Sequence, residues 1–406
     1  MEIGSESDME GQRMVNNTEK QFAEADIQYM KVAAELAALG EGGVNPNPLV
    51  GAVIVRDGRI IGKGYHARYG QLHAERQAIA DAEKNLGGSG PGFLRGSSMY
   101  VTLEPCCHQG KTPPCTDAIL EAGIERVVIG LRDPNTVAAG GKELLEAAGV
   151  ETECGLLEGE LKKQNEVFLK YVQTKKPFVA MKYAMSADGK IACNGGTSKW
   201  ITEEAARKDV QKLRNRYMGI MVGIGTVLSD DPRLTCRMPE GRNPVRIVCD
   251  SSLRITTDCN LVKSAKDIPL YIMCLYPEAG KTGEGAKKYK EKAEGLKKAG
   301  CRLIYCNSNA DGRVDLCEGL FKLGKEGIDG ILLEGGSTLN FAMLKAGLVD
   351  RIYAYVAPKI LGGAGAPTAV GGNGWPTPDE GKKLKIEEVV QIGEDLRIQF
   401  SFREIS

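Results

Sequence analysis

Histidine and tryptophan are scarce in this chain of 406 residues, which contains three of the first and two of the second. Charge of one sign is not in excess either, because 53 lysines and arginines balance 53 aspartates and glutamates. A neutral chain gives no electrostatic reason to expect a nucleic acid or an anionic membrane as a partner. Long hydrophobic runs are also missing, so we expect no segment that spans a membrane.

A disulfide framework is missing as well, although the chain contains twelve cysteines. They are scattered along a chain that is too long to be a small disulfide-stapled domain. We expect most of them to be reduced, buried thiols in a reducing compartment, which predicts a cytoplasmic protein. Residues 1–24 are polar and contain no secretory signal. Their acidic residues argue against a cleaved transit peptide, so we interpret them as a flexible leader.

The length of the chain exceeds one ordinary core, and two domains are expected. Strands and helices alternate after an initial hairpin at Asp57-Gly58, which predicts a mixed sheet covered on both faces. A charged, helix-like connector covers residues 158–177, and a second α/β series begins at Phe178. We therefore predict an α/β fold with three parts: a leader at 1–24, a first domain at 25–172 and a second at 173–406.

The scarce histidines lie close to a group of cysteines in the first third of the chain. His73-Ala74-Glu75 is followed by Pro105-Cys106 and later by Cys115. One neutral imidazole and two thiolates fill three positions of a tetrahedral zinc ion, and water takes the fourth. This set, with a glutamate that is not a ligand, is typical of zinc deaminases. The sequence therefore predicts a hydrolytic site with one zinc ion per chain.

Local structure supports this interpretation. His73 begins an expected helix, and Cys115 lies in the first turn of another, where the helix N-terminus lowers the pKa of a thiol. We expect Glu75 to take a proton from the zinc-bound water and return it to the ring nitrogen and the leaving ammonia. A structural zinc site with His108 or Cys107 as fourth ligand is an alternative, as is coincidence. Cys107 also competes with Cys106, which we favour because it directly follows the proline.

The surrounding motifs closely resemble one known family, the bifunctional deaminase/reductases of riboflavin biosynthesis. The resemblance extends from about residue 25 to the C-terminus and includes a long loop between the ligand cysteines, where cytidine deaminases use a short Cys-x-x-Cys. Cys107 departs from the family, which usually has serine there. The stretches that carry the resemblance in the first half are residues 44–53, 64–66, 73–75 and 104–115.

The resemblance implies a cytidine-deaminase-like first domain. Its substrate would be a small phosphorylated pyrimidine, a diaminopyrimidinone that carries a ribosylamino 5′-phosphate. Asn47 would hydrogen-bond the base and His108 its carbonyl, while His66, Lys111 and Asn135 would hold the ribose and phosphate. A phosphate dianion favours cations and amide donors, which agrees with these assignments. By themselves, Asn47 could be a turn residue and His66 an exposed residue at a strand end.

The second half contains only a partial Gly-x-Gly-x-x-Gly pattern, at residues 222–228, so a plain Rossmann domain is not expected. The stretch Glu334-Gly335-Gly336 follows a predicted strand and precedes a predicted helix. Backbone N–H groups at such a helix start can receive a phosphate, although a glycine-rich turn without a ligand is also possible.

Residues 182–192, 198–202, 225–235 and 334–336 resemble the reductase half of the same family. This resemblance implies a dihydrofolate-reductase-like α/β domain that uses NADPH and forms a dimer or tetramer. The implied NADPH contacts are Met185, Trp200, Thr226, Ser251 and Gly336. The implied substrate contacts are Ser198, Arg214, Asp230, Leu234, Arg237 and Glu334. Asp230 would also act electrostatically beside the reacting carbon; by itself, it could simply end a helix.

We predict a two-step enzyme that deaminates the pyrimidine and then reduces its ribosyl group to ribityl. A nucleic-acid deaminase would need a basic stripe and stacking aromatics, yet aromatic residues make up 6% of the chain. A scaffold with a closed zinc site would not need Glu75. A single-activity variant would have lost one set of motifs, and both sets are present.

Overall fold

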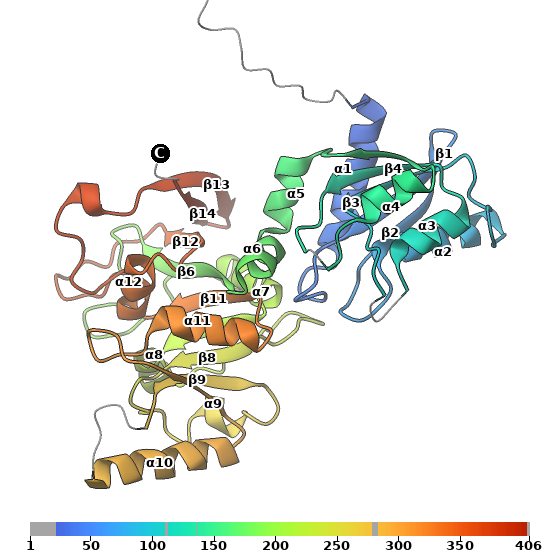
Figure 1. Cartoon of the computed structure of the whole chain (residues 1–406). Helices are drawn as coiled ribbons and strands as arrows, with labels where there is room; N and C mark the ends of the chain where they lie inside the picture. The colour runs from blue at the N-terminus through green and yellow to red at the C-terminus, as the bar shows by residue number, and fades with distance from the viewer. Residues whose placement is uncertain (1–21, 110–112, 136, 278–282, 404–406) are drawn as a thin grey trace, which may run out of the picture.

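The computed structural model describes residues 22–109, 113–135, 137–277 and 283–403. These residues form two α/β domains that lie side by side, each around its own β-sheet (Figure 1). Two helices of the connector lie between the sheets. No helix in the described ranges is both long enough and apolar enough to cross a bilayer.

The N-terminal domain contains a five-stranded sheet with the order β2-β1-β3-β4-β5. β1 runs antiparallel to β2 and to β3, whereas β3, β4 and β5 are parallel. The mixed sheet predicted from the hairpin is therefore confirmed. The strands are β1 (Gly51–Arg56), β2 (Arg59–Tyr65), β3 (Ser98–Leu103), β4 (Arg126–Leu131) and β5 (Glu151–Cys154).

Helices cover both faces of this sheet. α1 (Glu24–Ala38) and α5 (Glu158–Gln164) pack on one face, and α2 (Ala74–Leu86), α3 (Cys115–Ala122) and α4 (Gly141–Ala147) lie on the other. Two glycines allow close approach. A Cβ at Gly51 would lie 1.9 Å from the carbonyl oxygen of Ala33 in α1, and one at Gly64 would lie 2.3 Å from that of Ala74. The second contact fixes the start of α2, where the predicted metal ligand His73 lies.

The C-terminal domain contains a nine-stranded sheet with the order β10-β9-β8-β7-β11-β6-β12-β14-β13. All neighbours are parallel except β12–β14 and β14–β13, which form an antiparallel edge. The strands are β6 (Phe178–Ser186), β7 (Gly219–Gly223), β8 (Val245–Cys249), β9 (Leu270–Leu275), β10 (Arg302–Cys306), β11 (Gly330–Gly335), β12 (Arg351–Ala357), β13 (Leu384–Ile392) and β14 (Asp395–Phe402).

The helices of this domain connect the parallel strands, as the alternating pattern predicts. They are α7 (Glu204–Arg216), α8 (Ile224–Asp230), α9 (Asn260–Lys263), α10 (Gly283–Lys298), α11 (Leu316–Lys325) and α12 (Ser337–Lys345), with a short 3₁₀ helix, η1 (Pro378–Glu380), before β13. Apolar side chains on both faces of the sheet form its core, with buried residues such as Met181, Ile220 and Leu333.

The helix-like connector consists of two helices. α5 ends and α6 (Glu166–Thr174) begins at Asn165, which is buried. The Asn165 side-chain oxygen accepts the backbone N–H of Leu49 at 2.8 Å, and its amide donates to the Leu49 carbonyl at 2.9 Å. The side chain at this break thus satisfies both backbone groups of the half-buried Leu49.

Candidate functional site

The predicted metal ligands meet at the edge of the N-terminal sheet where β2 and β3 end. His73 caps the start of α2, and Cys115 is the first residue of α3. Nδ1 of His73 lies 3.5 Å from Sγ of Cys106 and 3.4 Å from Sγ of Cys115. The backbone N–H of Cys115 donates to the Cys106 carbonyl at 3.1 Å, which holds the two cysteines together.

This donor set fits a zinc ion. Nitrogen and sulfur ligands at about 2.0 and 2.3 Å from a tetrahedral zinc lie about 3.5 Å from each other. The three ligand atoms lie within 4.8 Å of one another, and no fourth His, Cys, Asp or Glu in the described residues joins them. Sγ of Cys107 instead lies 3.2 Å from the carbonyl oxygen of Ala139, away from this group. Three protein donors leave a fourth position for water.

The two thiols differ in acidity. Hydrogen bonds from Cys115 and His73 lower the pKa of Cys106 to about 4, although burial opposes this shift. The hydrogen bond to Cys106 raises the pKa of Cys115 above its usual range, and burial raises it further. The expected effect of the helix N-terminus on Cys115 stays a prediction, because the neighbouring Cys106 and burial set the direction of this shift. A metal cation would deprotonate a coordinating thiol.

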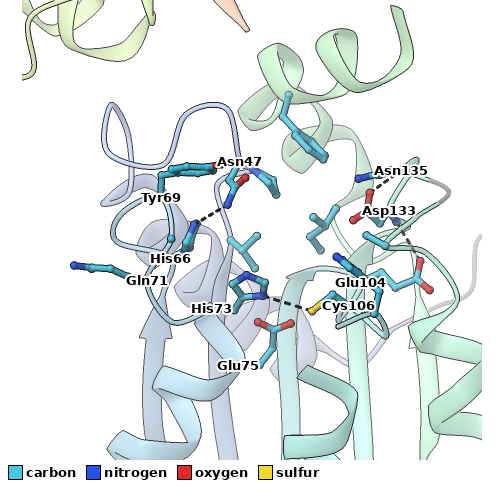
Figure 2. Close-up of a pocket in the computed structure, with 17 residues that line it drawn as sticks. Asn47, His66, Tyr69, Gln71, His73, Glu75, Glu104, Cys106, Asp133 and Asn135 are labelled. Atoms are coloured by element: carbon cyan, nitrogen blue, oxygen red, sulfur yellow. Dashed lines mark hydrogen bonds between the residues drawn. The ribbon is translucent and has the colours of Figure 1, made fainter. Parts of the chain in front are cut away.

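Glu75 lies in the first turn of α2, and its residue is 3% exposed. Figure 2 shows its carboxylate directed toward His73 and Cys106. Burial raises the pKa of Glu75 to about 7, and the negative charge of Cys106 acts in the same direction. A carboxyl group with a pKa near neutrality can both accept and return a proton at physiological pH. The environment of Glu75 thus suits a general acid and base.

A cavity of about 270 Å³ opens beside this group of residues. Four of the five residues expected to bind the pyrimidine substrate line it: Asn47, His66, His108 and Asn135. Lys111, the fifth, lies outside the described residues. Nδ1 of His108 is buried without a hydrogen-bond partner in the described part of the chain, so a polar ligand group would satisfy it.

His66 and Asn47 contact each other at one wall of the cavity (Figure 2). Nδ1 of His66 lies 3.2 Å from the carbonyl oxygen of Leu72, and Nε2 lies 3.2 Å from the Asn47 amide nitrogen. A proton on Nδ1 satisfies both contacts, because Nε2 then accepts from Asn47. Burial lowers the pKa of His66, which favours the neutral ring. His66 therefore fixes the orientation of the Asn47 amide.

Sequence reasoning missed several residues that line the cavity, namely Tyr69, Gln71, Glu104, Asp133 and Phe168. Glu104 belongs to the same Glu-Pro-Cys motif as the predicted ligand Cys106, and this proximity could have indicated a role in the site. Its buried carboxylate accepts backbone N–H groups of Asp133, Gly140 and Lys142 at 3.0 to 3.1 Å. These bonds hold the loop that presents Asp133 and Asn135 to the cavity. Burial raises the pKa of Asp133 to about 6.

Four of the five residues expected to bind NADPH lie at the carboxyl edge of the nine-stranded sheet. Met185 lies near the end of β6, and Ser251, Thr226 and Gly336 follow β8, β7 and β11. Thr226 Oγ1 donates to the carbonyl of Gly335 at 3.4 Å. A Cβ at Gly336 would lie 3.3 Å from Thr226 Oγ1. The carboxyl ends of adjacent parallel strands are where α/β proteins bind ligands.

Arg214 and Glu334, two expected substrate contacts, form a buried bidentate ion pair. The Nε and Nη2 atoms of Arg214 donate to the two carboxylate oxygens of Glu334 at 2.8 and 2.9 Å. Lys182 lies 3.7 Å from the same carboxylate. Burial alone would raise the pKa of Glu334, but the charges of Arg214 and Lys182 outweigh burial and lower it to about 2. Glu334 is therefore ionised at neutral pH.

The other expected reductase residues are placed as follows. Trp200 is exposed and stacks under Arg207, whose guanidinium lies 4.5 Å from the ring centroid. Asp230 is exposed at the end of α8 and accepts the Ser229 hydroxyl at 2.8 Å. The Ser251 hydroxyl accepts the backbone N–H of Val314 at 3.1 Å. Leu234 is buried, Ser198 is half-buried and Arg237 is exposed.

Comparison with known proteins agrees with this geometry. Residues 23–131 match the family model of the cytidine and deoxycytidylate deaminase zinc-binding region, and residues 177–398 match that of the RibD C-terminal domain. The chain therefore consists of a zinc-binding deaminase domain followed by a reductase domain.

Relatives that share both halves define the family. The riboflavin biosynthesis protein RibD of Actinobacillus pleuropneumoniae is 46% identical over 376 residues, which cover 92% of this chain and 95% of that protein. A diaminohydroxyphosphoribosylaminopyrimidine deaminase/5-amino-6-(5-phosphoribosylamino)uracil reductase from Thermotoga maritima has a similar structure, with a TM-score of 0.80 and 38% identity over 93% of this chain and 99% of that chain. RibD of Acinetobacter baumannii gives a TM-score of 0.81 and 33% identity over 94% and 99%. The chain belongs to the RibD family of bifunctional deaminase/reductases of riboflavin biosynthesis.

Proposed function

We propose that this chain deaminates a diaminopyrimidinone ribosylamino 5′-phosphate and then reduces the ribosyl group of the product with NADPH. The observation that carries the first step is the position of Glu75, buried beside His73, Cys106 and Cys115 at the base of a cavity. The deaminase and reductase activities for which the Thermotoga maritima relative is named support the same pair of reactions.

In the deaminase step, His73, Cys106 and Cys115 would hold one zinc ion. Such an ion supplies the Lewis acidity that lowers the pKa of a water molecule at its open position. Glu75 would take one proton from that water and deliver it to the ring nitrogen as the hydroxide adds to the carbon that carries the amino group. It would then transfer the remaining hydroxyl proton to the amino group, so that the C–N bond breaks and ammonia leaves. Its pKa of about 7 matches this double role, because the carboxyl group is neither strongly acidic nor permanently protonated.

The cavity residues would select and orient the substrate. Asn47, fixed by His66, would hydrogen-bond the base, and the unpartnered nitrogen of His108 would contact its carbonyl. Asn135 and His66 would contact the ribose and phosphate, and Lys111 would supply a cation for the phosphate. His66 would contribute a hydrogen bond and not a charge, because burial favours its neutral form.

In the reductase step, the residues at the carboxyl edge of the nine-stranded sheet would hold NADPH, which supplies the reducing equivalent. The positive φ angles of Gly335 and Gly336, 42° and 94°, leave a turn without side chains that suits a phosphate group. Met185, Trp200, Thr226 and Ser251 would contribute the remaining contacts. Substrate would contact Ser198, Arg214, Leu234, Arg237 and Glu334, and Asp230 would stabilise positive charge at the reacting carbon.

Three further assignments complete the proposal. The domain boundary would lie at residues 172–173, inside α6. Residues 1–21 of the expected leader lie outside the described residues, and its last residue, Glu24, is the first residue of α1. The chain would form a dimer or tetramer through the reductase domain. It would act in the cytoplasm, where buried thiols such as Cys306, whose pKa burial raises to about 12, stay reduced.

Two measurements test the proposal. The protein should release ammonia from the diaminopyrimidinone substrate and should oxidise NADPH when given the deaminated intermediate. Absence of either activity in the zinc-loaded protein would contradict the two-step assignment. Asp230→Asn should lower the reductase rate while ammonia release is unchanged, and an unchanged reductase rate would remove Asp230 from the proposed site.

A further inference from the structure

We propose that the reductase domain positions the substrate-binding wall of the deaminase cavity, through a contact between Asp329 and Asn45. The Asn45 side-chain amide donates to the Asp329 carboxylate at 2.6 Å, across the two domains. Asp329 is 2% exposed and directly precedes β11 of the nine-stranded sheet. This inference rests on the proposed role of Asn47 in binding the base.

Asn45 is part of the turn that presents Asn47 to the cavity. The backbone N–H of Asn47 donates to the carbonyl of Val44 at 2.8 Å, so Asn45 and Pro46 are the central residues of a tight turn. Asn47 then lines the cavity and contacts His66. A side chain at the centre of such a turn, anchored to a buried carboxylate, fixes the position of the residue that closes it.

Other reductase residues hold the preceding part of the same segment. Arg242 Nη2 lies 3.5 Å from the Asn45 side-chain oxygen, so both ends of the Asn45 amide contact reductase residues. The Asn215 amide donates to the carbonyl of Glu41 at 3.3 Å, and Arg216 pairs with the Glu41 carboxylate at 3.4 Å. A Cβ at Gly42 would lie 2.4 Å from the Asn215 amide nitrogen, so the two segments are in close contact there.

Residues 41–45, which these reductase residues hold, also support a second wall of the cavity. The backbone N–H of Tyr69 donates to the carbonyl of Gly43 at 3.1 Å. A Cβ at Gly43 would lie 2.5 Å from the carbonyl oxygen of Ala67. Tyr69 and its neighbours Gly70 and Gln71 line the cavity. Displacement of residues 41–45 would therefore shift both Asn47 and the Tyr69 loop.

The contact is far from the reductase chemistry. Asp329 lies at the amino end of β11, whereas Glu334 and the glycine turn lie at its carboxyl end. Glu334 lies five residue steps along the extended strand from Asp329, a distance of about 16 Å. Asp329 can therefore affect the deaminase cavity without touching the residues proposed to bind NADPH. We classify Asp329 and Asn45 as positioning residues, because they act on the substrate through Asn47.

The test is steady-state kinetics of ammonia release by the zinc-loaded full chain. Asn45→Ala and Asp329→Ala should each raise the deaminase KM about tenfold with kcat nearly unchanged, which is the effect of losing one buried charged hydrogen bond. The double variant should be no worse than either single variant, because the two changes remove the same contact. Asp329→Asn keeps an acceptor oxygen for Asn45 and should recover most of the affinity.

Controls separate this effect from general damage. Lys163→Met removes a cross-domain ion pair with Glu387 that lies on the surface, and should leave both activities unchanged. The reductase kcat/KM should be unchanged in every variant. An unchanged deaminase KM in Asn45→Ala would overturn the inference, as would a parallel fall in both activities. If Asp329→Ala does not fold, Asn45→Ala decides alone.

Asn47→Ala distinguishes failure of this inference from failure of the proposed function. A raised KM in Asn47→Ala together with an unchanged KM in Asn45→Ala means that Asn47 binds substrate but the reductase domain does not position it. An unchanged KM in Asn47→Ala removes Asn47 from the proposed substrate site, and the inference falls with it.

Discussion

Sγ of Cys115 lies 3.4 Å from Nδ1 of His73, although 42 residues separate them in the chain. Each residue lies at the start of a helix on the same face of the first sheet. The close packing of α2 on Gly64 and the hydrogen bond from Arg76 of α2 to the Pro114 carbonyl at 2.8 Å hold the two helix starts together. Helix placement thus brings the proposed metal ligands together, and each ligand can be tested by itself.

We predict that Cys115→Ser lowers the zinc content from about one ion per chain to near zero and abolishes ammonia release. A hydroxyl is a far weaker zinc ligand than a thiolate. NADPH oxidation should remain, because the reductase site is in the other domain. Elemental analysis and the two activity assays measure these effects. Cys107→Ser is the matched control and should retain zinc. If Cys107→Ser lost zinc while Cys115→Ser kept it, Cys107 and not Cys115 would be the ligand.

We predict that Glu75→Gln keeps its zinc but releases ammonia about 10²- to 10⁴-fold more slowly, which is the usual contribution of a general acid–base group. The amide has nearly the same shape as the carboxyl group but cannot accept the proton. Glu121→Gln, on the exposed face of α3, should leave the rate unchanged. A zinc-loaded Glu75→Gln protein with the parent rate would exclude Glu75 as the base.

We predict that Glu104→Ala lowers the free energy of unfolding by about 3 kcal/mol and raises the deaminase KM, because three buried N–H groups lose their acceptor. Those groups hold the loop that carries Asp133 and Asn135. Urea unfolding and ammonia-release kinetics measure both effects. Glu143→Gln is the control. Arg132 pairs with Glu104 at 3.2 Å and with the exposed Glu143 at 2.7 Å, so loss of the Glu143 pair alone should change neither quantity. If both variants changed stability and KM equally, the ion pair with Arg132, and not the three backbone hydrogen bonds, would explain the role of Glu104.

We predict that the ion pair between Asp26 and Arg126 makes stability depend on pH. The hydrogen bond from Arg126 holds the pKa of Asp26 below its usual value of 3.8, although burial opposes this shift. The unfolded chain therefore binds this proton more readily than the folded chain. The resulting stabilisation is fully present above about pH 4 and is lost as the pH falls through the folded-state pKa.

Asp26→Asn measures this contribution. It should lower the free energy of unfolding at pH 7 by about 2 kcal/mol, the value of a hydrogen-bonded buried charge. The difference from the parent protein should shrink as the pH is lowered from 5 toward 2, as followed by urea unfolding. A difference that stays constant over this range would contradict the assignment. Glu24→Gln, exposed on the same helix, should leave the urea midpoint unchanged at every pH.

The connector illustrates the limit of local reasoning about the fold. Composition predicts a charged, helix-like connector over residues 158–177, and residues 158–164 and 166–174 are helical. The break at Asn165 depends on Leu49, which is 116 residues away and needs partners for both backbone groups. Likewise, α4 and β5 were not expected, because residues 141–154 lack a strong periodic pattern and are stabilised by their neighbours in the sheet.

The sequence by itself determined the chemistry of the first site, because His73, Glu75, Cys106 and Cys115 are residue types that few other functions require at that spacing. It also determined the two α/β series, since apolar periodicity is a local property. Only the tertiary structure decided that Cys107 faces away from the metal group, that Glu104 and Asp133 belong to the cavity, and that Asp329 contacts the turn before Asn47. These relationships join segments that are distant in the chain, and their side-chain directions depend on how the helices pack on the sheets. Spacing along a sequence cannot encode such directions; packing sets them.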